Sequence, residues 1–408
     1  MKPYIAIILA MLVFSSLSFA QTPDDYFRIA AENNPGLKAI YKEYEAALQK
    51  VPQVSTLPDP TFSFGYFISP VETRVGPQKA RFSLTQMFPW FGTLKAQGNT
   101  ATLMAEAKFQ SFIDARNKLY FRVASAYYPL FELKKWVRIE QDNISILESY
   151  KNIANQKFKN GTGSMVDVLR VDIMLKEAQT NLSILRDKEK PLMTTFNKLL
   201  NRPENEMVQI NDSLSAEILS DNFMKDSLIA SNPALKALDL KIQASKASEL
   251  AVQKQGLPKL GVGLDYVIVG ERTDVSMSDN GKDAFMPMVT VSIPIFRGKY
   301  NASLKEARLM QESYTYQKQE VANALISEFE MVWFQVQQQL QLLSLYEQQK
   351  ETSQQSLNLL FAAYGNSGKE FEEVLRMQQQ LLKYRKMSAT ALAQYLIAVE
   401  KINYLTSN

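Results

Sequence analysis

The chain has 408 residues and a formal net charge of +4, with no Cys and no His. The missing Cys excludes disulfides and a lipid-carrying cysteine, and the missing His removes the commonest general base and metal ligand. Because no nucleophile–base pair stands out and no basic tract occurs, we expect neither an enzyme, nor a cofactor, nor a nucleic-acid partner.

Residues 1–20 have the pattern of a secretory signal peptide. Lys2 is followed by an apolar run over residues 5–14, and Ser18 and Ala20 are the small residues that a signal peptidase requires. We expect cleavage after Ala20. No later segment reaches the apolar length of a transmembrane helix, about 20 residues, so a membrane role would depend on β-strands.

The remaining sequence is a tandem repeat. Asn34-Pro35 recurs as Asn232-Pro233, and Asp167-Val168-Leu169 recurs as Glu373-Val374-Leu375. We expect a first structural repeat over residues 21–203, an equatorial inter-repeat segment over 204–230, and a second repeat over 231–408. Each repeat should contain a short helix, two β segments, a very long helix, a turn and a return helix.

Two pairs of alternating segments predict four β-strands. Segments 61–68 and 80–87 are separated by residues 69–79, which contain Pro70, Gly76 and Pro77 and are expected to form a loop. Segments 260–268 and 285–293 flank a polar loop over 271–283. One face of each strand is apolar or aromatic and the other small or polar, as for lipid outside and water inside. A soluble β-sandwich edge is the alternative.

Everything else is expected to be helical. Residues 93–158 and 299–364 contain almost no Gly or Pro and are rich in good helix formers. At about 1.5 Å per residue, each helix would span roughly 100 Å, a length that suggests coiled-coil packing. The return helices are expected over residues 164–200 and 370–404.

Four strands cannot close a barrel, and open strand edges are not tolerated in lipid. Two copies would supply eight strands with little free interior, whereas three would supply twelve around an open bore. The predicted fold class is therefore mainly α with a small transmembrane β part. Long antiparallel helices would form an α-barrel, and each subunit of a homotrimer would contribute four strands to a 12-stranded β-barrel.

The chain resembles the TolC-like outer-membrane factor family over essentially all of residues 22–406. The two Asn-Pro openings, the strand-to-helix corners Phe91-Gly92 and Phe296-Arg297-Gly298, and the two helix–turn–helix stretches carry the resemblance. It implies a homotrimer in the cell outer membrane, with its helical part in the periplasm. Leu57-Pro58-Asp59-Pro60 resembles the branch that exports heavy-metal cations.

The resemblance also implies a function and partners. The protein would be the outer-membrane channel of a tripartite efflux system, passively conducting drugs or metal cations. Its partners would be a periplasmic adaptor (membrane fusion) protein and an inner-membrane pump of the RND type. A duct for type I protein secretion and a soluble periplasmic coiled-coil scaffold are the alternative functions.

The two helix turns are expected to form a periplasmic tip that carries the gate and the adaptor contact. Carried over by position, its residues are Asp167, Tyr364, Lys369 and Glu373. In a trimer each acid would become a ring of three carboxylates, which favours cations, and Lys369 could bridge to an acid of a neighbouring helix. Gly161, Gly163 and Gly368 are expected to permit the turn backbone.

A purely structural role competes with each of these assignments. Segments 164–167 and 367–370 resemble helix capping boxes, and Tyr364 could be the last apolar anchor of its helix. The 16 Met residues are scattered without ligand spacing, so they are expected to fill the core rather than to bind metal.

Overall fold

The computed structural model describes residues 23–216, 229–274, 276–367 and 371–407. The predicted signal peptide therefore lies outside the described residues. Contacts divide the chain into two compact units. Unit 1 combines residues 1–39, 113–232 and 323–408, and unit 2 combines residues 40–112 and 233–322. Each unit is described by itself.

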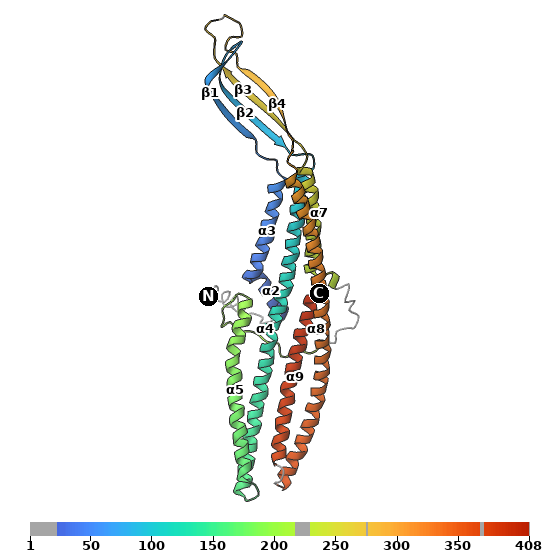
Figure 1. Cartoon of the computed structure of the whole chain (residues 1–408). Coiled ribbons are helices and arrows are strands. Elements are labelled where there is room, and N and C mark those ends of the chain that lie inside the picture. Colours follow the sequence, from blue (N-terminus) through green and yellow to red (C-terminus); the bar gives the residue numbers. More distant parts are fainter. Residues whose placement is uncertain (1–22, 217–228, 275, 368–370, 408) are drawn as a thin grey trace, which may run out of the picture. The chain divides into compact units, whose positions relative to one another are not determined.

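One order of elements, a helix, two strands, a long helix and a return helix, occurs twice along the chain, and α2 precedes its first occurrence (Figure 1). The first series consists of α2 (Pro23–Asn33), α3 (Pro35–Ser55), β1 (Thr61–Thr73), β2 (Gly76–Phe88), α4 (Thr93–Lys159) and α5 (Met165–Leu199). The second consists of α7 (Pro233–Gln255), β3 (Lys259–Val269), β4 (Ala284–Ser292), α8 (Gly298–Ser367) and α9 (Phe371–Thr406). The predicted fold class, mainly helical with four strands, is confirmed.

The strands form one antiparallel sheet in the order β1-β2-β3-β4. The loop predicted over residues 69–79 is wrong, because β1 and β2 continue through it and turn only between Thr73 and Gly76. The pairing of β1 with β2 shifts register between Tyr66 and Val71. Pro70 lies in this irregular stretch of an outer strand, where a residue without an N–H is tolerated.

The predicted alternation places unlike residues on the two faces of the sheet. Directly paired rings cross all four strands on one face, and their successive centroid distances are 5.1, 6.4 and 5.2 Å. This face is highly exposed, and Ile68 at 92% is the most exposed large apolar residue of the described chain. The four paired rings on this face are those of Phe64, Phe82, Tyr266 and Phe285.

The opposite face carries polar and small residues beside Met87, Met286 and Met288. Asp265 is 0% exposed and accepts hydrogen bonds from the Arg81 guanidinium and, at 2.5 Å, from the Ser83 hydroxyl. Gly261 and Gly263 occupy the same face of β3. A Cβ added at Gly261 would lie 2.5 Å from Met87 Sδ, and one added at Gly263 would lie 2.9 Å from Thr85 Oγ1. The sheet thus has one apolar face and one face with a neutralised ion pair.

In unit 1, α4 runs beside α5, and α8 runs beside α9 (Figure 1). A cluster of buried apolar residues joins these helices near their turns. Farther along, Glu140 of α4 is 1% exposed and pairs with Lys386 of α9, while Gln378 donates to Asn143 Oδ1 at 3.1 Å. The apolar cluster near the turns includes Leu147, Tyr150, Val171, Leu357, Tyr364, Phe371, Val374 and Leu381.

In unit 2, ion pairs join neighbouring helices. Lys108 of α4 pairs with Glu43 of α3 at 2.7 Å, and Arg308 of α8 pairs with Glu249 of α7 at 2.8 Å. In the part of the chain that the structure describes, none of the helices contains an apolar stretch of the length that a membrane span requires.

Candidate functional site

The turn between α4 and α5 is closed by two backbone hydrogen bonds. Thr162 N donates to Lys157 O at 2.9 Å, and Gly161 N donates to Phe158 O at 3.0 Å. Gly161 has φ +71°, so this is a Schellman motif with glycine in the left-handed position. Gly163 has a different reason to be glycine, because an added Cβ would lie 2.8 Å from Lys157 Cβ.

Asp167 lies in the first turn of α5. Ser164 is the N-cap, and its hydroxyl accepts a hydrogen bond from Val166 N at 3.1 Å. The carboxylate of Asp167 is therefore near the positive end of the helix dipole, where an acid stabilises the helix. Since the side chain is half-buried rather than enclosed, this location serves a cap and a pore-facing charge equally well.

Tyr364 is packed inside the tip of the single chain. It is 1% exposed, its ring stacks on Phe371 with centroids 4.3 Å apart, and Lys157 Nζ lies 4.9 Å from the ring centre. Burial raises the pKa of the Tyr364 phenol, and the charge of Asp167 adds to the rise. Among the described residues the phenol oxygen has no hydrogen-bond partner.

Lys157 connects the ends of two long helices. Besides its contact with the Tyr364 ring, its ammonium donates to Gly365 O at 3.2 Å. The helix α8 continues through Ser367, so the predicted end of this helix at residue 364 is wrong. Gly365 stays in the helix although glycine is a poor helix former. Gly368 and Lys369 lie outside the described residues.

Glu373 lies in the first turn of α9 and pairs with Arg376 three residues later. Its neighbour Glu372 makes the longer connection, because it pairs with Arg170 of α5 at 2.9 Å. This ion pair joins the two return helices at the tip. Both partners are exposed, so the free energy of the pair is on the order of 0.2–1 kcal/mol.

The sequence contains a signal for these arginines. Asp167-Val168-Leu169-Arg170 and Glu373-Val374-Leu375-Arg376 are identical at three of four positions, including the arginine, and carry an acid at the first. The two arginines nevertheless have different partners: Arg376 pairs with Glu373 within its own helix, and Arg170 pairs with Glu372 of the other return helix. Only the packing of α5 against α9 distinguishes them.

Within the described ranges, no group of three or more His, Cys, Asp or Glu side chains is placed to share an ion. Glu372 pairs with Arg170 and Glu373 with Arg376, and Asp167 is the third acid in these first helical turns. A ring of three like carboxylates at this position would require three copies of the chain.

Residues 225–407 match the model of the outer membrane efflux protein family. A curated relative is the outer membrane protein TolC of Salmonella enteritidis, 22% identical over 438 aligned residues, with coverage of 99% of this chain and 86% of that protein. The resemblance to the TolC-like family is confirmed. The expected location in the cell outer membrane agrees with the names of both the family and this relative.

Solved structures share the fold. The outer-membrane channel OprN has a TM-score of 0.74 at 16% identity, with coverage of 94% of this chain and 89% of that one. The channel CusC has a TM-score of 0.76 at 14% identity, with coverage of 94% and 91%. At this identity the likeness supports the fold: long helices combined with a four-stranded sheet.

Proposed function

We propose that this relative of the outer membrane efflux proteins is the channel subunit of a tripartite efflux system. Three copies would join their sheets into a 12-stranded β-barrel and their helices into a tube. Substrates would pass through this tube passively, and the inner-membrane pump would supply the energy. The same pump would deliver them through a periplasmic adaptor protein.

The observation that carries this proposal is the sheet of the single chain. Within the described residues, β1 and β4 pair on one side only, so each chain offers two free strand edges. One face is apolar and exposed, with Val289 at 78%, whereas the other holds the buried Asp265. An apolar face suits lipid, and the free edges require partners before the sheet can lie in a membrane.

The helix turns of unit 1 support a gate in such a duct. Helices α5 and α9 begin beside one another, and their first turns carry Asp167, Glu372 and Glu373. In a trimer these acids would form rings around the axis and would favour cations at a constriction. Opening would rearrange the tip helices, biased by binding of the adaptor.

Two measurements test the proposal. The purified full chain should require detergent, and its mass in solution should correspond to three copies. In planar bilayers it should conduct ions, and Glu373→Ala should reduce its preference for cations. A monomer that stays in solution without detergent would contradict the channel itself. Unchanged cation selectivity in the variant would contradict only the role of Glu373.

A further inference from the structure

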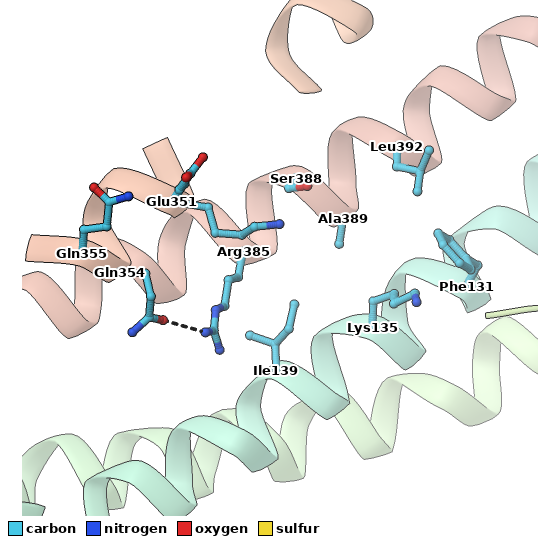
Figure 2. Close-up of a pocket in the computed structure, with 11 residues that line it drawn as sticks. Phe131, Lys135, Ile139, Glu351, Gln354, Gln355, Arg385, Ser388, Ala389 and Leu392 are labelled. Atoms are coloured by element: carbon cyan, nitrogen blue, oxygen red, sulfur yellow. Dashed lines mark hydrogen bonds between the residues drawn. The ribbon is translucent and has the colours of Figure 1, made fainter. Parts of the chain in front are cut away.

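A groove in unit 1 lies between α4, α8 and α9 and encloses about 710 Å³ (Figure 2). Its apolar lining comes from Phe131 and Ile139 of α4 and from Ala389 and Leu392 of α9. Phe131 is fully buried, so its ring is a fixed part of the lining. The volume lies within the range of small-molecule sites, and one chain supplies every lining residue.

Arg385 carries a positive charge in this groove without an acidic partner. Its guanidinium donates to Gln354 Oε1 at 3.1 Å (Figure 2), and across the described parts of the chain no carboxylate pairs with it. Half-buried arginines are commonly paired with carboxylates or phosphates, whose planar or tetrahedral oxygens fit the guanidinium fork. The groove therefore holds a cation whose remaining donors face a partly apolar space.

The other charges of the groove leave this site positive. Lys350 is paired with Glu347 at 2.5 Å, and Lys135 donates to Asp212 O at 2.9 Å. Glu351 is the one acid that lines the groove, and Figure 2 shows its carboxylate directed away from Arg385. A ligand in the groove would thus meet an uncompensated guanidinium beside aliphatic and aromatic carbons.

We propose that this groove binds a small amphiphilic anion, a carboxylate or sulfonate attached to a compact apolar body. Arg385 and Gln354 would hold the acidic head, while Ile139, Ala389 and Leu392 would contact the body. The same residues would reject an organic cation of equal size, because it would bring a second positive charge beside Arg385. The site does not depend on the proposed channel function, since it is complete in one chain.

Two probes with the same ring and opposite charge provide the test. The full-length protein in nanodiscs of zwitterionic lipid would be titrated calorimetrically with 1-naphthalenesulfonate and with 1-naphthyltrimethylammonium. We expect one sulfonate to bind per chain, at least about tenfold more tightly than the ammonium probe, which equals about 1.4 kcal/mol. Equal affinity for the two probes would overturn the proposal.

Variants identify the residue responsible. Arg385→Gln should weaken binding of the sulfonate by about tenfold or more, and Arg385→Lys should weaken it less, because the charge remains without the planar fork. Lys383→Gln removes a charge from an exposed position of the same helix and should leave the affinity unchanged. Circular dichroism would verify that each variant is folded.

Two further results would count against the site. Undiminished binding to a folded Arg385→Gln protein would assign the sulfonate to another surface. Displacement of the sulfonate by phosphatidylglycerol added to the nanodiscs would assign the groove to a lipid head group instead of a solute.

Discussion

The side-chain amide of Asn34 donates a hydrogen bond of 2.9 Å to the carbonyl oxygen of Leu199, the last residue of α5. The same side chain caps α3, because its Oδ1 accepts from Leu37 N at 3.1 Å. The second repeat has a matching bond of 3.0 Å from Asn232 to Leu405 O. One asparagine in each repeat thus satisfies a helix end that would otherwise lack a partner.

We expect Asn34→Ala to lower the free energy of unfolding by about 2 kcal/mol or more, because it removes a helix cap and leaves a carbonyl without its donor. Asn34→Asp should cost less, since the cap acceptor remains. Thermal unfolding followed by circular dichroism would measure both changes. Asn301→Ala at an exposed helical position is the control, and equal melting temperatures for the two alanine variants would contradict the prediction.

Asp265→Asn should change the ion selectivity of the channel. Asp265 neutralises Arg81 on the polar face of the sheet, so the variant would leave three uncompensated guanidinium groups in a trimer. Reversal potentials in a salt gradient should move toward anion preference. Asp279→Asn removes the same charge from an acid that pairs with Lys282 in the loop before β4. If both variants shifted the potential equally, the paired charges of the sheet would not set selectivity.

Glu400 should make a contribution to stability that grows on acidification. Burial raises the pKa of this carboxyl, with a further contribution from Asp24, although bonds from Asn403 and Tyr128 oppose the rise. A folded-state pKa above the ordinary value of about 4.3 gives stability that is complete below that pH. The gain is lost as pH rises through the raised pKa.

Glu400→Gln should therefore stabilise the protein at neutral pH and flatten the dependence of its melting temperature on pH. Asp114, whose carboxylate accepts a hydrogen bond from Tyr404 at 3.5 Å, also has a raised pKa because of burial, so part of the dependence should persist. Glu148→Gln removes an exposed acid from α4 and should leave the slope unchanged. An unaltered slope in Glu400→Gln would refute the assignment.

Gly161→Ala should destabilise the tip by about 1–2 kcal/mol, the cost of the left-handed conformation for an L-residue. No atom lies within 4 Å of the added Cβ, so the cost comes from the backbone alone. Hydrogen exchange of the tip amides should become faster. Gly298→Ala, also in open space but without positive φ, should be neutral or stabilising. Unchanged exchange rates in Gly161→Ala would argue against strain at the turn.

Much of the architecture could be predicted because it depends on local patterns. The alternation from 260 to 268 sets the two faces of β3, and the scarcity of Gly and Pro sets the lengths of α4 and α8. The errors occurred where local signals conflict with pairing. Pro70 and Pro77 suggested a loop, but hydrogen bonds to neighbouring strands extend β1 and β2 through that stretch. The second long helix was expected to end near residue 364, but it continues through Ser367.

The candidate site was predicted less completely. The repeat indicated Asp167 and Glu373, whose places in the first turns of their helices follow from sequence position alone. Their partners depend on distances between helices that are remote in sequence. Arg170 and Arg376 each follow an acid and Val-Leu, yet only Arg170 reaches across to Glu372.

By itself the sequence determined the repeat, the alternating faces of the strands and the helical segments, because each is written in residues a few positions apart. The tertiary structure decided which side chains meet across those elements: Asn34 with Leu199, Arg81 with Asp265, and Lys157 with the ring of Tyr364. The physical reason is that such contacts need two backbones brought within a few ångströms of each other. Only the packing of the whole chain sets those separations.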